Sequence, residues 1–343
     1  MTLREGPRHV SSNTVGTHSW QASLEARVAS IDEEIRSLLT QPEPALQPFY
    51  GMMLYHLGLD AGRPRGGKRL RPLLCLLVFE ALAGEPERVL PAAAAIELLH
   101  NFTLIHDDIE DQDPARHHRP TVWSVWGVPQ AINAGDGMYA VSRLAVQRLR
   151  KRGFPAERIL DFANLTDQTC VRVCEGQFLD ISFESRTDVT AERYRVMAAR
   201  KTGALFAASA QSAAMLASDD ASVREQLARF GEEFGQAFQA HDDLLGMLAF
   251  ERASPRVRAQ LDELFAPQAP LPAENVDRIR AILDDLGVRP MLEREIEAHR
   301  GRALHILHGV AAAGGPPLLL LDHLVASATG AADEPAAAPT LSA

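Results

Sequence analysis

A chain of 343 residues is long enough for one large domain or two ordinary ones, and 46% hydrophobic residues can supply a sizeable core. The formal net charge of −10 argues against nucleic acid or an anionic membrane surface as the main partner. Any phosphate that this chain binds must therefore be held by a few local cations. Abundant Ala and Leu and only 6% aromatic residues favour helices.

The two ends and the cysteines set the expected compartment. Residues 1–19 are polar, which predicts a disordered N-terminus without a signal peptide, and no apolar run approaches the length of a membrane span. Residues 329–343, rich in Ala and Pro, are expected to be a disordered tail. Cys75, Cys170 and Cys174 show no disulfide or zinc spacing, so we expect buried, reduced thiols in a cytoplasmic protein.

Helical patterns follow one another along almost the whole chain. They are expected at about 20–40, 46–57, 72–82, 91–111, 131–152, 156–184, 190–217 and 222–250, with shorter helices at 252–265, 273–286, 289–309 and 317–328. No convincing alternating strand is present. The sequence therefore predicts an all-α fold, as a single domain over residues 20–328.

A basic loop at 60–72 stands out in this acidic chain. It gathers five cations around three glycines, namely Arg63, Arg65, Lys68, Arg69 and Arg71. A solvated basic loop is the simplest explanation. A flexible glycine backbone beside clustered cations is also typical of an anion site, and we favour that interpretation.

Acidic residues close the apolar helix expected at 91–111. Asp107 and Asp111 lie four residues apart on one face, with Asp108 beside them. Like charges at this spacing repel one another at a helix end that is already negative, so a cation is needed there. Mg²⁺ fits, since it is commonly shared between carboxylates and substrate phosphates. The alternative is a solvated helix end paired with Arg116 and Arg119.

A second acidic pair lies in an apolar helical segment. Asp242 and Asp243 follow Gln239 by about one turn, and buried carboxylates need a partner or a metal ion. Two helices that each bring carboxylates to one cavity could hold a diphosphate through bridging Mg²⁺. Lys201, on a largely apolar helix between the two pairs, could extend to solvent or contact that phosphate.

Over about residues 46–245 the chain resembles the polyprenyl synthetase family, the trans-isoprenyl diphosphate synthases. The resemblance rests on residues 66–72, His100, 107–111, Arg116, 120–123, 131–136, 176–180, Lys201-Thr202 and 238–243, in the family's order. It implies an all-α isoprenoid synthase (prenyltransferase) bundle around a deep apolar cavity, usually as a homodimer.

The resemblance also implies a role for each matching residue. Asp107, Asp111 and Asp242 would bind Mg²⁺, and Asp108 and Asp243 would support them. An allylic isoprenoid diphosphate would be held by Arg116, Lys201, Thr202 and Gln239, and a second, homoallylic one, isopentenyl diphosphate, by Lys68, Arg71 and His100. Phe102 and Thr103, just before Asp107, would shape the cavity floor.

Three departures from the family pattern bear on the reaction. The second of two paired arginines is replaced by His117, which lacks a permanent charge. Gly246 stands where a third aspartate is common. The lid that follows is missing, and no lysine occurs after Lys201. Arg252, Arg256 and Arg258 could substitute for it, although a solvated basic face is the simpler explanation.

Three functions remain open from the sequence. We favour a terpene synthase with diterpenes as the expected products. It would ionise one allylic diphosphate such as the C20 compound, with Phe206 and Phe238 able to stabilise cations. The alternative is a chain-elongating prenyltransferase with a C15 to C20 product, and the third is a non-catalytic subunit.

Overall fold

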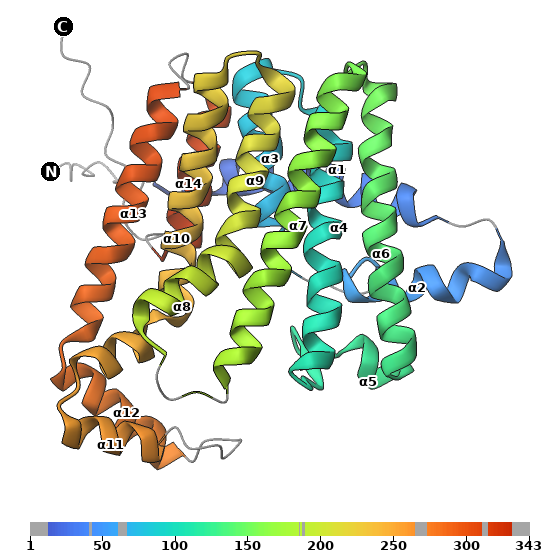
Figure 1. Ribbon diagram of the computed structural model, residues 1–343. Coiled ribbons are helices and arrows are strands. Elements are labelled where there is room, and N and C mark those ends of the chain that lie inside the picture. Colours follow the sequence, from blue (N-terminus) through green and yellow to red (C-terminus); the bar gives the residue numbers. More distant parts are fainter. Residues whose placement is uncertain are drawn as a thin grey trace, which may run out of the picture.

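Figure 1 shows a computed structural model of the chain, which describes residues 13–40, 43–60, 67–184, 186, 189–264, 273–310 and 315–330. Within these ranges the side chains of residues 13–19, 184, 191, 241–248, 250–251, 262, 273–274 and 276 are left out of the description. The helices are α1 (Asn13–Leu39), α2 (Gln47–His56), α3 (Leu70–Ala83), α4 (Pro86–Glu110), α5 (Val122–Trp126), α6 (Val128–Arg148), α7 (Ala156–Glu184), α8 (Ala191–Ala198), α9 (Ala204–Ala217), α10 (Ala221–Arg252), α11 (Pro255–Leu264), α12 (Ala273–Asp285), α13 (Val288–Val310) and α14 (Pro316–Ala328).

The all-α prediction is confirmed, and most helix bounds agree to within a few residues. α1 begins at Asn13 and not near residue 20, and residues 1–12 of the segment expected to be disordered lie outside the described residues. Of the predicted tail 329–343, only Thr329 and Gly330 are described. α4 begins at Pro86 rather than Pro91, because a proline five residues into a helix loses one hydrogen bond without ending it.

The long helices form a layered bundle with α4 in its core. Figure 1 shows α4, α6, α7, α9, α10 and α13 running side by side, and α4 packs directly on α3 and α6. The run Ala92–Ala95 is fully or almost fully buried, because small side chains let neighbouring helices approach closely. By length and composition α4 could cross a membrane, whereas no run of that kind was expected from the sequence. However, 78% of its apolar 18-residue stretch is buried inside the bundle.

A short hairpin follows α4, where the sequence predicted no strand. β1 (Ala115–Arg116) pairs antiparallel with β2 (Arg119–Pro120). His117 and His118 form the connection, with φ of 49° and 60°. Two successive positive φ values are typical of a tight hairpin turn. The hairpin is therefore recognised by the conformation of its turn and not by alternating apolar residues in its strands.

The helix predicted over 190–217 is interrupted. A π-helical turn, η3 (Ala199–Gly203), joins α8 to α9 and carries Lys201 and Thr202. Such single π turns inside helices often occur at functional sites.

Two short helices, α11 and α12, follow α10 where the family lid is missing. They share a small separate core with α10 and α13 that includes Ala249, Leu261 and Leu292. Figure 1 shows α11 and α12 at the end of the bundle where α4 and α7 also end. Arg252 donates to the backbone oxygen of Leu286 (3.1 Å), so it fastens this unit instead of replacing a lid lysine.

Candidate active site

The three aspartates of α4 lie where two cations converge. Arg116 donates from Nε to Oδ1 of Asp108 (2.6 Å) and its Nη2 lies 3.4 Å from Oδ2 of Asp107. Lys201 places Nζ 3.1 Å from Oδ1 of Asp107 and 2.6 Å from Oδ2 of Asp180. The pairing with Arg116 that the sequence left open is thus present, whereas Arg119 binds Asp60 (3.0 and 3.1 Å).

The acidic cluster keeps unmet negative charge in spite of these partners. Burial and the neighbouring negative charge of Asp107 together raise the pKa of Asp111 to about 6. Burial also raises the pKa of Asp108, against the opposing effect of Arg116. The Oδ2 atom of Asp108 is buried and has no hydrogen-bond partner among the described residues. Hard oxygen donors with excess charge fit a divalent cation such as Mg²⁺.

The second acidic pair lies on the backbone of α10, but the side chains of Asp242 and Asp243 are outside the described residues. Gln239, one turn earlier, lines the same cavity as Lys201 and Thr202. Among the described side chains no three metal-ligating groups converge.

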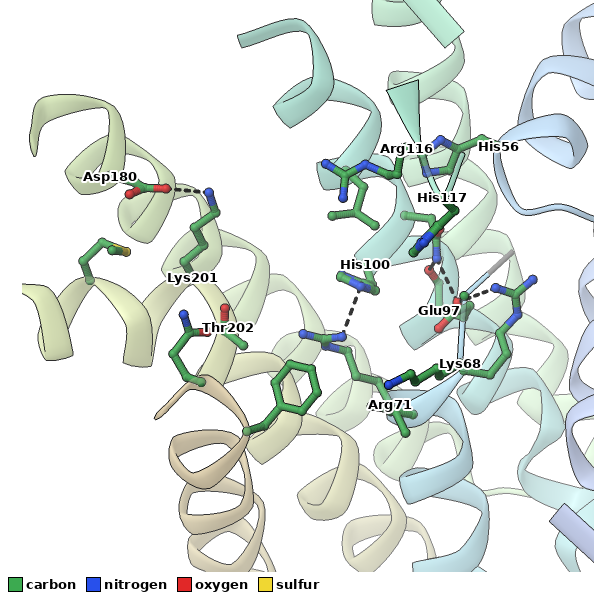
Figure 2. Close-up of a pocket in the computed structure, with 18 of the residues that line it drawn as sticks. His56, Lys68, Arg71, Glu97, His100, Arg116, His117, Asp180, Lys201 and Thr202 are labelled. Carbon is green, nitrogen blue, oxygen red and sulfur yellow. Dashed lines mark hydrogen bonds and ion pairs between the residues drawn. The ribbon is translucent and has the colours of Figure 1, made fainter. Parts of the chain in front are cut away.

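A cavity of about 480 Å³ opens beside the aspartates, and Figure 2 shows it. The structure brings together here all the residues expected to bind the two diphosphates, Lys68, Arg71, His100, Arg116, Lys201, Thr202 and Gln239. Lys201, Thr202 and Asp180 lie across the cavity from Arg71, His100 and Arg116 (Figure 2). Sequence reasoning missed His56 and Asp180, which also line this cavity; the second was visible only as part of the motif at 176–180.

Arg71 is a half-buried cation with an unpaired donor. Burial lowers the pKa of Arg71 to about 10, so it remains charged at neutral pH. Its Nη1 atom lies 3.1 Å from Nε2 of His100, and its guanidinium lies 4.4 Å from the ring centre of Phe206. Nε of Arg71 has no partner among the described residues. An anion in the cavity could satisfy it.

Arg69 lies between Lys68 and Arg71 but faces the interior. Its Nε donates to Asp32 (2.9 Å), its Nη1 to Glu97 (3.1 Å) and its Nη2 to the backbone oxygen of Leu57 (2.6 Å). Its backbone is left-handed, with φ of 52°. Arg69 therefore anchors the start of α3, and this anchoring leaves the two flanking cations at the cavity.

A second cavity, of about 340 Å³, runs between α4 and α7 from Lys201 and Thr202. Apolar side chains dominate its wall, including Leu99, Phe102, Val173, Phe178 and Leu205. Phe102 is 8% exposed and packs edge-to-face on Tyr139, at 5.2 Å between ring centres. Thr103 lines the cavity beside it.

Cys75, Cys170 and Cys174 are all free thiols, as predicted, but only Cys75 is buried. Cys170 is half-buried and Cys174 is exposed, because both lie on the α7 face that lines the mouth of the second cavity. A hydrogen bond from Cys170 lowers the pKa of Cys174 to about 7.

Gly176 of α7 allows the π turn to approach. A Cβ at this position would collide with the backbone nitrogen of Lys201 and would lie 2.6 Å from its Cα. We expect Gly176→Ala to push η3 away and to weaken binding of inorganic diphosphate in the presence of Mg²⁺ about tenfold, measured by calorimetry. Gly301→Ala, in α13 with nothing within 4 Å of the added atom, should leave the affinity unchanged. Equal affinity in both variants would contradict this role.

An acidic cluster, two sets of cations and an apolar cavity lie together in this helical bundle, an arrangement suited to a substrate that carries a diphosphate and a hydrocarbon chain. The chain belongs to the polyprenyl synthetase family, whose model matches residues 59–257. Its homology and fold therefore support an enzyme of isoprenoid biosynthesis.

The relatives include synthases of two product lengths. The chain is 40% identical to a geranylgeranyl diphosphate synthase of Methanosarcina mazei, over 68% of this chain and 69% of the relative. It is also 40% identical to a (2E,6E)-farnesyl diphosphate synthase of Mycobacterium tuberculosis, over 63% of this chain and 60% of the relative. The geranylgeranyl pyrophosphate synthetase structure from Pyrococcus horikoshii superposes with a TM-score of 0.81 and 27% identity, over 92% of this chain and 99% of that chain.

Proposed function

We propose that this protein is a prenyltransferase that condenses isopentenyl diphosphate with an allylic diphosphate to give a C15 to C20 polyprenyl diphosphate. The observation that carries this proposal is the second cation set. Lys68, Arg71 and His100 line the same cavity as Lys201, so two diphosphates can be held side by side. The names of the relatives support the same reaction.

The site residues fall into groups with different roles in the proposed reaction. Asp107, Asp111 and Asp242 would hold Mg²⁺, which when bound supplies positive charge to the departing diphosphate. The allylic diphosphate would be oriented by Arg116, Lys201, Thr202 and Gln239. Asp108 and Asp243 would support the magnesium ligands. The allylic carbon–oxygen bond breaks, a carbon–carbon bond forms to the isopentenyl group, and one proton leaves. The apolar second cavity excludes water from the cationic carbon.

This proposal reverses the order of preference drawn from the sequence. The terpene synthase hypothesis rested on His117 and on the missing lid, but none of the relatives or structures named above is a terpene synthase. The cavity also retains cations for a second diphosphate. The non-catalytic hypothesis fits poorly with Asp107, Asp111 and Lys201 gathered at one site.

Product analysis separates the three functions. Purified protein is incubated with Mg²⁺ and C10, C15 or C20 diphosphates, each with and without labelled isopentenyl diphosphate. We expect label in a longer diphosphate. A hydrocarbon or alcohol formed from one allylic diphosphate alone would favour the terpene synthase instead. Full recovery of the substrates would favour the non-catalytic subunit.

Phe102 is expected to limit product length. Replacing it with Ala removes the ring that narrows the second cavity near Asp107, so products should become longer by at least one isoprene unit. Loss of a buried ring also costs about 3–5 kcal/mol of stability, so the assay is run well below the melting temperature. Chromatography of dephosphorylated products provides the measurement, and an unchanged distribution would contradict the assignment.

We also propose a homodimer formed through α6 and α7. Leu160, Val171 and Phe178 are 61%, 59% and 70% exposed and lie on one face of α7, and Leu144 of α6 is 54% exposed. Because a second copy presents the same apolar face, a twofold contact would cover it. The cytoplasmic location expected from the sequence stays a prediction.

Phe178→Asp tests this surface. A carboxylate on the apolar face should convert the dimer to a monomer in analytical ultracentrifugation, because an unpaired buried charge is strongly unfavourable. Leu319→Asp, at a residue 60% exposed on α14, is the matched control and should remain dimeric. A monomeric wild-type protein, or a dimeric Phe178→Asp variant, would contradict the proposal.

A further inference from the structure

Three imidazoles line the first cavity. His56 comes from α2, His100 from α4 and His117 from the hairpin turn. Figure 2 shows all three on the side of the cavity opposite Lys201. Of these, His117 stands where the family pattern has an arginine, and it is the exposed one, at the rim.

These imidazoles are held neutral in the free protein. Burial, followed by the charges of Arg116 and Arg69, lowers the pKa of His56 to about 3. Burial and then Arg71 push the pKa of His100 well below its ordinary range. For His117, partial burial and the same two arginines, Arg116 and Arg69, lower the pKa. The cavity thus has neutral groups ready to accept protons.

Arginine charges surround His117, and the two nearby carboxylates each bind one of those arginines. The charged or titratable groups on the elements around it are Arg116, His118 and Arg119 of the hairpin, Lys68 and Arg69 before α3, Glu97, His100 and Asp108 of α4, and Tyr55 and His56 of α2. Glu97 binds Arg69 and Oδ1 of Asp108 binds Arg116. The neighbouring groups that shift the pKa of His117, namely Arg116, Arg69 and His118, all lower it. Asp180 and Lys201, across the cavity, bind each other.

A bound diphosphate would reverse this field. An ordinary imidazole has a pKa of about 6.5, and an opposite charge within hydrogen-bonding reach typically raises such a value by a unit or more. His117 pays the smallest desolvation penalty of the three imidazoles because it lies at the exposed rim.

We propose that His117 takes up a proton when isopentenyl diphosphate enters the first cavity and then binds that diphosphate as an imidazolium. The inference rests on the proposed function, since it assigns this cavity to the second substrate. Where the family pattern has a permanent guanidinium, this chain has a charge that is present only with the ligand.

The sign of the pH dependence follows directly. The bound state holds more protons than the free state, so affinity for isopentenyl diphosphate strengthens as pH falls through the pKa of bound His117. For one proton the change is at most about tenfold per pH unit. The gain levels off below the pKa of His117 in the free protein.

Calorimetric titration of the full chain with isopentenyl diphosphate, in buffers of different ionisation enthalpy at about pH 7.5, measures this proton. We expect uptake of about half a proton or more per site. The ligand's own last ionisation, at a pKa of about 6, could only release protons, so it cannot imitate uptake. Zero uptake or net release by the wild-type protein would overturn the inference.

Three variants assign the proton. His117→Asn keeps a polar side chain that tolerates positive φ but cannot be protonated, and it should lose the uptake and bind about tenfold more weakly. His117→Arg should bind tightly without uptake and with little pH dependence. His118→Asn, the neighbouring exposed histidine of the same turn, should behave as wild type.

The remaining outcomes separate the two proposals. Uptake that persists in His117→Asn would overturn the assignment to His117. If the wild-type protein does not bind isopentenyl diphosphate at all, the proposed function itself fails, and the inference with it. Circular dichroism confirms that each variant is folded.

Discussion

Replacing Asp107 with Asn should reduce kcat for condensation by about 10²–10³-fold, because the variant loses a charge placed where the departing diphosphate needs a metal ion. Asp107 lies 3.1 Å from Lys201 and 3.4 Å from Arg116, and it lines the second cavity. Asn keeps the shape and one oxygen, so the loss should fall on kcat rather than on folding. Steady-state kinetics with an allylic diphosphate and isopentenyl diphosphate measure it.

Asp161→Asn is the matched control. Asp161 is exposed near the start of α7, roughly 30 Å along the helix from Asp180. Its variant should keep wild-type kinetics. If Asp107→Asn retains kcat within a few-fold of wild type, the acidic end of α4 is not the metal site.

Arg69→Met is expected to lower the free energy of unfolding by about 3–5 kcal/mol. Arg69 is 4% exposed and pairs with two buried carboxylates, Asp32 and Glu97. Removing the guanidinium takes the charge of Arg69 away from both buried carboxylates, and the packing of the Met side chain cannot offset that cost. Urea denaturation followed by circular dichroism measures the change.

The comparison for this effect is Arg36→Met. Arg36 forms an exposed pair with Glu33 at 3.8 Å, and such a surface pair contributes about 0–1 kcal/mol. Equal destabilisation by the two variants would show that the buried pairing of Arg69 has no special role. A further readout is binding of isopentenyl diphosphate, which should weaken in Arg69→Met because the position of Lys68 and Arg71 depends on the same anchor.

The sequence was sufficient for the helices and for the aspartates of α4. Long helical periodicity and the spacing of Asp107 and Asp111 are local properties, and the structure places the predicted cations around them. The local sequence also indicated Lys201 as a candidate, but it did not explain how Lys201 comes to contact Asp107. That reason is the π turn and the close approach of Gly176, which involve helices far apart in the sequence.

Residues of equal chemistry could not be told apart from the sequence. Arg69 and Arg71 lie two positions apart and both line the first cavity, yet the guanidinium of Arg69 binds Asp32 and Glu97, whereas Nε of Arg71 has no partner among the described residues. The left-handed backbone at Arg69 decides this, and no composition rule predicts it. Arg252 had also been considered as a lid cation, whereas its contact with Leu286 depends on the packing of α10 against the following helices.

The most direct test of the proposed prenyltransferase reaction is whether diphosphate release depends on the second substrate. Purified protein receives Mg²⁺ and a C15 allylic diphosphate, and released inorganic diphosphate is followed with and without labelled isopentenyl diphosphate. We predict release only when both substrates are present, with one diphosphate freed for each isopentenyl unit incorporated. Release at the same rate from the allylic diphosphate alone, with no label in the product, would contradict a prenyltransferase.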